Sequence, residues 1–273
     1  MTTQDELGDR MKDYERRETG RRFFPTLPVY ARIDGRGFSK FTKGMNRPFD
    51  QRMTDAMIEV TRHLVKETHA TIGYVQSDEI SLVWMSPDYT SDIFFSGKEQ
   101  KMVSVLASMA AAKMAQVIRG WEPYDNRLPN FDCRVLQLPN VHEAANMFLW
   151  RALDAQKNAV SMACRAIASA KQMHGKGQRD MLAMVADAGV DYDAYPDAFR
   201  KGTFIRRRKV ERPLTEEELA KIPAKLRDGD LIVTRSEVVV VENVPPFQRV
   251  SNRTEFIMGG ADAIERVYDD VVE

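Results

Sequence analysis

The stretch VYARIDGRGF at residues 29–38 is typical of a strand that runs directly into a glycine-containing loop. Apolar side chains at every second position from residue 29 to residue 33 indicate that the strand is half-buried. The strand ends at Asp34, and Gly-Arg-Gly follows at once. Such an acidic strand end is either an ordinary Asp-Gly turn or one part of a cation-binding site, and the segments around it decide between the two.

The segments that follow predict a regular alternation of helices and strands. Methionine, valine and leucine at helical spacing predict a helix over residues 50–70. Residues 71–84 predict two short strands around a Ser-Asp-Glu tip, followed by a second helix at 98–119 and a fourth strand at 131–138. This order is that of the split βαβ, ferredoxin-like plan, which also describes the palm of many nucleotide polymerases and cyclases. We therefore predict an α+β fold built on a ferredoxin-like polymerase palm.

The second half of the chain has a different pattern. A long helix is predicted at 140–170, and residues 203–244 predict a β-rich appendage with a short helix that opens on a capping box at 215–218. We expect two regions, a palm catalytic core with an N-terminal helix and a long helix with a β-rich region packed on the palm, at residues 1–139 and 140–273.

The composition bounds the class of protein. The 273 residues are 43% hydrophobic and include 40 basic and 40 acidic residues, which excludes a disordered chain and allows a sizeable core. No apolar run approaches the ~20 residues that span a membrane, and the polar N-terminus is unlike a signal peptide. The two cysteines have no metal or disulfide spacing. We expect a cytoplasmic protein with reduced thiols and no membrane partner.

Three carboxylates are candidates for a metal site. In the split βαβ plan, the strand ending at Asp34 lies beside the strand pair whose tip holds Asp78 and Glu79. Carboxylates gathered in this way repel one another unless a cation lies between them. Two Mg²⁺ ions about 3.5–4 Å apart are the usual device for nucleotidyl transfer. Gly35 and Gly37 would let backbone N–H groups turn toward a triphosphate. Each motif alone fits a plain turn, but the pair in palm order favours a metal site.

Five blocks of sequence resemble, in this order, the tRNA-histidine guanylyltransferase family and its bacterial, archaeal and phage relatives: RIDGRGFSKF, YVQSDEISLVW, FDCRV, FLWRALDAQKNAVSM and FRKGTFIRR. The resemblance implies a nucleotidyltransferase that works in the 3′–5′ direction, opposite to ordinary polymerases. The 5′ end of a tRNA is activated by ATP or carries a triphosphate, and the 3′-hydroxyl of an incoming nucleotide, GTP first, attacks it. It also implies a homotetramer or dimer.

The resemblance assigns roles to residues of this chain. Asp34 and Asp78 would hold both Mg²⁺ ions with the Gly35 carbonyl, and Glu79 and Ser77 would support them. Backbone N–H groups of Arg36, Gly37 and Phe38 would bind the triphosphate. Arg47 would contact phosphate, and Asp50 would read guanine. Lys98 and Lys101 would open the second helix near the nucleotide or the tRNA 5′ end. The nucleotide-binding set is Arg36, Gly37, Phe38, Ser39, Arg47, Asp50, Ser77, Lys98, Lys101 and Asn158.

The basic segment near residue 205 is the predicted tRNA contact. Alternate residues of a strand reach one face, and phosphate contacts of this kind position an RNA without reading its sequence. A charge run is more often a solvated face, but the family resemblance raises RNA contact above that interpretation. The predicted tRNA-binding residues are Arg200, Lys201, Arg206, Arg207, Arg208 and Lys209.

The chain departs from the eukaryotic members at a block on the long helix. Their His-Ile-Asn-Asn is replaced here, since Gln156 stands for the histidine, Asn158 is retained and Ala159 replaces the second asparagine. Ser39 stands where those members have a histidine near the base. Glutamine does not titrate near neutral pH as histidine does. The departures favour templated repair of 5′-truncated tRNAs over histidine-specific addition. A palm-type nucleotide cyclase and a non-catalytic tRNA-binding protein remain the alternatives.

Overall fold

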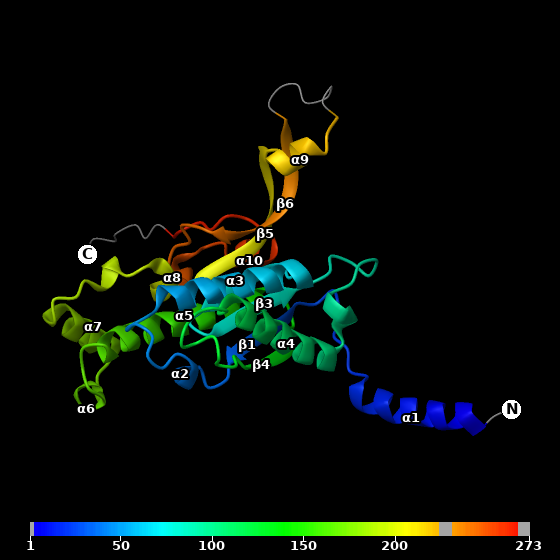
Figure 1. The fold of residues 1–273 in the computed structure, drawn as a ribbon, viewed down its shortest axis with the longest axis horizontal. Helices are drawn as coiled ribbons and strands as arrows, with labels where there is room; N and C mark the ends of the chain where they lie inside the picture. The colour runs from blue at the N-terminus through cyan, green and yellow to red at the C-terminus, as the bar shows by residue number, and fades with distance from the viewer. Residues whose placement is uncertain (1–2, 224–230, 267–273) are drawn as a thin grey trace, which may run out of the picture.

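The structure, a computed structural model, describes residues 3–223 and 231–266. Its centre is a six-stranded antiparallel sheet with the order β4-β1-β3-β2-β5-β6 (Figure 1). The first four of these strands have the order of a ferredoxin-like palm, which confirms the predicted fold class. The strands are β1 (Val29–Gly35), β2 (Ile72–Gln76), β3 (Glu79–Trp84), β4 (Phe131–Gln137), β5 (Thr203–Pro213) and β6 (Ile232–Val241).

Helices surround this sheet and extend beyond it. The predicted long helix ends at Arg165 rather than at residue 170, because Ser169 begins a new helix with a capping box. The α-helices in the described part of the chain are α1 (Thr3–Thr19), α2 (Phe38–Phe41), α3 (Gln51–Thr68), α4 (Glu99–Val117), α5 (Val141–Arg165), α6 (Ala170–Met173), α7 (Gln178–Asp187), α8 (Asp197–Lys201), α9 (Glu216–Ala220) and α10 (Arg253–Met258). None of them is long and apolar enough to cross a membrane.

The two faces of the sheet bury separate cores. Helices α3 and α4 cover one face, where Ile33 of β1 packs with their methionine, valine and leucine side chains. Helix α5 covers the other face, where Tyr30 of β1 packs with Phe148. The alternation seen in the sequence of β1 therefore reflects two buried faces, and the polar member Tyr30 is satisfied by a 2.7 Å hydrogen bond to Ser81. Burial raises the pKa of Tyr30, so its hydroxyl stays protonated.

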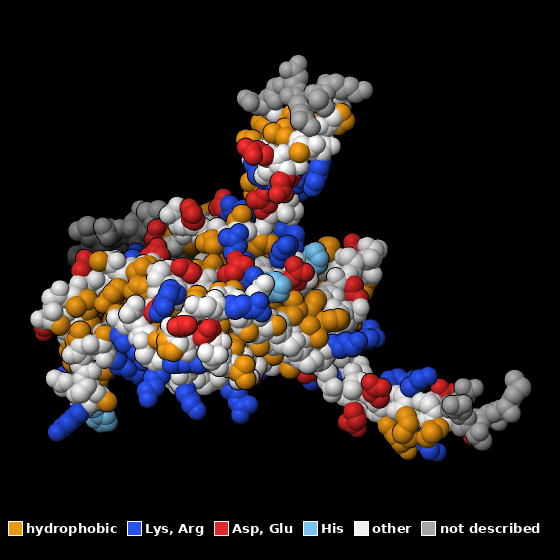
Figure 2. All heavy atoms as spheres, viewed as in Figure 1, with side chains coloured by type: hydrophobic (Ala, Val, Ile, Leu, Met, Phe, Trp, Pro, Cys, Tyr) orange, Lys and Arg blue, Asp and Glu red, His pale blue; other side chains and the backbone are white. Residues whose placement is uncertain are grey.

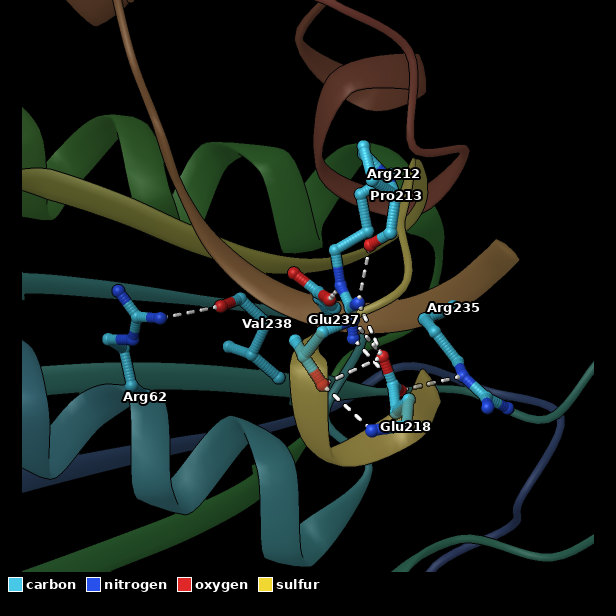
Figure 3. Close-up of polar contacts among 8 residues, drawn as sticks. Arg62, Arg212, Pro213, Glu218, Arg235, Glu237 and Val238 are labelled. Carbon is cyan, nitrogen blue, oxygen red and sulfur yellow. Dashed lines mark hydrogen bonds and ion pairs between the residues drawn. The ribbon is translucent and has the colours of Figure 1, made fainter. Parts of the chain in front are cut away.

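Strands β5 and β6 continue the palm sheet and then leave it as an arm (Figure 1). Beyond residue 206, β5 pairs only with β6. A two-stranded ribbon is marginally stable alone, and α9 braces this one at its tip. Arg212 donates to both Glu218 and Glu237 at 2.8 Å, and Glu218 closes the predicted capping box (Figure 3). Nearer the body, Arg62 of α3 donates to the carbonyl of Val238 at 3.0 Å (Figure 3).

Helix α1 projects from the body at the lower right of the view, away from the arm (Figure 1). Its junction with the body includes an ion pair between Arg21 and Glu99 at 3.0 Å. Leu7, Met11 and Tyr14 follow one another at helical spacing on α1, and each is about half exposed. The structure therefore leaves an apolar stripe on this helix without cover from the described residues.

Candidate functional site

The ends of β1 and β3 bring the predicted carboxylates together. Asp34 lies opposite Glu79 in the β1–β3 ladder, and the Gly35 N–H donates to the Asp78 carbonyl at 3.0 Å. Residues that lie directly opposite each other on two antiparallel strands point to the same face of the sheet. Asp34 and Glu79 therefore both point toward the α5 side. Asp78 occupies the β2–β3 turn directly beyond them. The juxtaposition predicted from the palm order is present.

The electrostatics of Asp78 are those of a site that favours a cation. Burial, and next to it the negative charge of Asp34, raises the pKa of Asp78 to about 6. A bound cation would offset both effects, because it stabilises the charged carboxylate. Mg²⁺ is commonly bound by one or two carboxylates, with water and phosphate oxygens completing its shell. Within the described residues no group of three or more His, Cys, Asp or Glu is arranged to hold a metal ion, so Asp34 and Asp78 with the Gly35 carbonyl stay a predicted donor set.

Glu79 is held by an arginine that the sequence analysis did not place at the site. Arg151 of α5 donates twice to the Glu79 carboxylate, at 2.5 and 2.7 Å, and once to Asp154 at 2.9 Å. Both members of the pair are buried, and the bidentate geometry fixes the carboxylate in orientation. Arg32 lies farther off, with its Nε 4.0 Å from Glu79. The structure thus gives Glu79 a positioning role at the carboxylate cluster.

A pocket of about 320 Å³ opens beside Asp78. It lies between the loop that precedes α3, the helices α3, α5 and α8, and the end of β2, and its wall is largely apolar. This size and lining are typical of a small-molecule site. The predicted metal ligand Asp78 lines it, and so do the predicted nucleotide residues Phe38, Ser39, Arg47, Asp50, Ser77 and Asn158. The apolar wall includes Met45, Phe49, Met53, Met57, Met162 and Phe199.

The loop after Asp34 needs its two glycines for different reasons. A Cβ on Gly35 would lie 2.4 Å from the ring of Phe38, so a glycine is needed here to let that ring pack against the backbone. Gly37 has a φ of 70°, in the left-handed region that side chains disfavour. The Arg36 N–H donates to the carbonyl of Asn130 at 2.8 Å, which corrects its predicted role in triphosphate binding. The N–H groups of Gly37 and Phe38 have no such partner among the described residues.

Lysine and arginine side chains gather along the edge of the molecule around α2 (Figure 2). The residues of this segment include Arg36, Lys40 and Lys43, and all three are exposed. Arg36 belongs to the glycine loop and Lys40 and Lys43 follow it in the chain, so a polyanion that approached Asp34 and the loop would meet positive charge on the same edge.

Asp50 has a structural task that the sequence analysis did not anticipate. It caps α3, where its carboxylate accepts from the Arg52 N–H at 3.1 Å and from the Asn46 N–H at 3.2 Å. It also binds the Arg52 guanidinium through both oxygens, at 3.0 and 2.8 Å. The hydrogen bonds from Arg52 lower the pKa of Asp50 to about 2. Since its carboxylate is engaged in this way, the structure does not leave Asp50 free to read a guanine base.

Lys98 and Lys101 lie at the other end of the palm. Lys98 forms an isolated bridge with Arg22, in the segment that precedes β1, whereas Asp34 lies near the end of that strand. A strand rises by about 3.3 Å per residue, so the length of β1 alone separates the two ends by more than about 15 Å. Lys98 and Lys101 are not among the residues that line the pocket, and their role near a nucleotide or the tRNA 5′ end stays a prediction.

The predicted tRNA-binding residues divide between the faces of β5. Arg206 is 2% exposed and donates to the carbonyls of Phe256 and Ala261, so the prediction that it contacts RNA is wrong. Its face is covered by α10, which the strand pattern alone does not reveal. Lys209 is exposed. The others are partly exposed and engaged: Arg207 with the Lys66 carbonyl, Arg208 with Asp262, Arg200 with Asp193 and Asp197, and Lys201 with Asp197.

Three residues near the site were missed by sequence reasoning. Gln76 and Arg165 line the pocket, and Arg151 holds Glu79. Each stands inside or next to a sequence block that marked the family resemblance, which was the available signal. Gln156, which replaces the histidine of eukaryotic members, pairs with the Gln248 amide through two hydrogen bonds of 2.9 and 3.0 Å.

Known proteins are similar to this chain in sequence and in structure. The tRNAHis guanylyltransferase family model matches residues 8–139. The structure of a bacterial tRNA(His) guanylyltransferase-like protein in complex with ATP is similar with a TM-score of 0.75 and 30% identity, over 93% of this chain and 97% of that chain. A corresponding complex with GTP has a TM-score of 0.70 and 31% identity, over 89% and 94% of the two chains. The tRNA(His) guanylyltransferase of Neurospora crassa is 28% identical over 204 residues, 67% of each chain. The chain therefore belongs to the tRNAHis guanylyltransferase family of nucleotidyltransferases.

Proposed function

We propose that this enzyme adds nucleotides, GTP first, to the 5′ end of tRNA in the 3′–5′ direction. The observation that carries the proposal is the pair of carboxylates, Asp34 and Asp78, at adjoining strand ends beside a pocket of nucleotide size. The related bacterial proteins bind ATP and GTP, which are the activating and the first added nucleotide of the proposed reaction.

In this proposal each part of the site has its own role. Asp34, Asp78 and the Gly35 carbonyl would hold two Mg²⁺ ions, which supply activation of the attacking hydroxyl and neutralise the leaving pyrophosphate. The free N–H groups of the loop would donate hydrogen bonds to phosphate oxygens, and the exposed guanidinium of Arg47 at the pocket would add a charged contact. The apolar wall would hold the nucleoside and exclude water around it. Arg151 keeps Glu79 in place and partly neutralises the charge that the cluster accumulates.

The preferred substrate in this proposal is a tRNA that lacks its first nucleotides. Gln156 is tied to Gln248 through both ends of its amide, so it is not a free replacement for a titrating histidine. This supports templated repair over untemplated, histidine-specific addition. Completion of an acceptor stem by base pairing needs no residue that reads the added base.

The test uses 5′-labelled tRNA-histidine transcripts, full-length and lacking the first nucleotide, with Mg²⁺, ATP and the four nucleotides. Wild-type protein is compared with Asp78→Ala. We expect extension of the truncated RNA up to a complete acceptor stem, and loss of that extension by at least 100-fold in the variant. Addition of a guanosine to the full-length RNA would instead establish histidine-specific activity. No extension of either RNA would overturn the proposal, and a cyclic product from ATP or GTP alone would identify a cyclase.

The remaining parts of the proposal concern assembly and organisation. The uncovered stripe of Leu7, Met11 and Tyr14 on α1 supports a homotetramer or dimer, because a second copy could bury it. We propose that residues 1–139 form the catalytic palm and that residues 140–273 pack on it and handle the tRNA. A cytoplasmic location stays a prediction of the sequence.

A further inference from the structure

Gln76 is a buried amide at the edge of the pocket. It is the last residue of β2, it is 7% exposed, and it lines the pocket two residues before Asp78. Its side-chain amide has no hydrogen-bond partner among the residues that the structure describes. Its backbone pairs with Glu79 in the β2–β3 ladder, which fixes the direction of the side chain toward the α5 side of the sheet.

An unpartnered amide in this position is unusual. Buried polar side chains in native proteins are nearly always hydrogen-bonded, and an unmade bond destabilises the fold. Two nearby polar side chains have partners, since Asp50 is fully engaged and the Asn158 amide donates to Asp154 at 3.2 Å. The amide of Gln76 instead keeps its residual exposure at a surface that lines the pocket. The position is therefore built to be satisfied by something that enters the pocket.

We infer that Gln76 hydrogen-bonds the nucleoside part of the bound nucleoside triphosphate and so positions it. The inference rests on the proposed function and identifies a further binding residue within that site. With the phosphates at Asp34 and Asp78, the nucleoside would lie against the pocket wall, which Gln76 lines. An amide offers both a donor and an acceptor, and either a sugar hydroxyl or a base edge can pair with it. Rotation of the amide by half a turn exchanges the two, so one residue can serve both ATP and GTP.

The first experiment compares Gln76→Met with Gln137→Met. Methionine has nearly the shape of glutamine but forms no strong hydrogen bonds. Gln137 is the matched control, because its amide is satisfied by the backbone of Phe24, at 2.7 and 3.3 Å, and it lies at the end of β4 remote from Asp34. Equilibrium binding of ATP and of GTP is measured without RNA, with Ca²⁺ in place of Mg²⁺, alongside the melting temperature.

The two variants are expected to behave in opposite ways. Gln76→Met should weaken ATP and GTP binding on the order of fivefold and leave the melting temperature unchanged, because the amide makes no hydrogen bond to the described residues. Gln137→Met should lower the melting temperature and leave both dissociation constants unchanged. Unchanged affinities in Gln76→Met, beside a wild-type protein that binds nucleotide, would overturn the inference while leaving the proposed function standing. A wild-type protein that binds no nucleotide would overturn both.

Nucleotide analogues then locate the hydrogen bond. If Gln76 contacts the sugar, the wild-type preference for ATP over 2′-deoxy-ATP or 3′-deoxy-ATP should shrink about fivefold in Gln76→Met. If it contacts the base, the preference for GTP over inosine triphosphate, or for ATP over purine riboside triphosphate, should shrink instead. Equal losses for every analogue, with all preferences retained, would mean that the amide does not bond the nucleoside and would overturn the inference.

Discussion

Arg151 and Glu79 form a buried ion pair whose strength can be measured directly. Arg151→Met leaves the Glu79 carboxylate buried without its bidentate partner, which should destabilise the fold by about 3–5 kcal/mol. Adding Glu79→Gln to that variant should recover much of the loss, because the uncompensated charge is removed. Urea unfolding of the two single variants and the double variant gives the coupling energy.

The control for this cycle is Arg119→Met, at an exposed position, which should change stability by no more than about 0.5 kcal/mol. Simple additivity of Arg151→Met and Glu79→Gln would contradict the interpretation that the pair acts as one unit.

Asp50 should make a contribution to the stability of the fold that depends on pH. Folding lowers the pKa of Asp50 to about 2, from the value near 3.9 expected in the unfolded chain. The stabilisation is therefore complete above about pH 4 and is lost as the pH falls from about 4 toward 2. Asp50→Ala should cost about 1 kcal/mol at pH 7 through loss of the helix cap alone. The difference from wild type, followed by urea unfolding, should shrink at pH 3, and a difference independent of pH would contradict this account.

Single residues show where sequence reasoning succeeds and where it fails. Asp34 and Asp78 could be placed together because strand order in a ferredoxin-like palm follows from element order alone. The engagement of Asp50 by Arg52 could not, because a capping aspartate and a ligand-binding aspartate have the same sequence signature. Arg206 was misassigned because alternation identifies a strand but not which segment covers each face. That segment, α10, comes about 50 residues later in the chain.

At the scale of elements, the β5–β6 arm depends on the cluster around Arg212. Its side chain joins α9 to both strands through Glu218 and Glu237, and these hydrogen bonds raise the pKa of Arg212 and lower that of Glu218 (Figure 3). Arg212→Ala should therefore speed amide exchange in α9 and the outer part of the arm, with little change in the palm. Hydrogen exchange with peptide resolution measures this, and Arg179→Ala on α7 is a surface control. Uniform protection in the arm of Arg212→Ala would show that strand pairing alone holds it.

The same arm shows how far the element pattern could be predicted. The β-strands within residues 203–244 and the capping box at Thr215 could both be predicted from the sequence, because alternation and capping are local signals. The pairing of β5 with β2, which widens the palm sheet, could not be predicted from the sequence. It joins segments that are about 130 residues apart. The end of α5 was placed five residues too late, since its apolar spacing continues past the point where Ser169 starts α6.

At the scale of the whole molecule, positive charge lies in different places on the palm, on the arm and along the edge around α2. Only some of these surfaces would contact a bound RNA. Lys209 is exposed on the arm, whereas Arg206, three residues earlier, is buried under α10. The two positions therefore separate a phosphate contact from a packing contact. Each protein–phosphate ion pair releases counterions, so its removal lowers the salt dependence of binding by about 0.9 in a logarithmic plot.

We predict that Lys209→Ala weakens tRNA binding and reduces this salt slope by about one, while Lys209→Arg leaves the slope unchanged. Arg206→Met should instead lower the melting temperature, because it breaks two hydrogen bonds to the backbone and a contact with the Phe256 ring, and its folded fraction should keep the wild-type slope. Fluorescence anisotropy of a labelled tRNA over a series of salt concentrations provides the slopes. A wild-type slope in Lys209→Ala would remove the arm from the RNA path and leave the edge around α2 as the surface that guides the 5′ end toward Asp34 and Asp78.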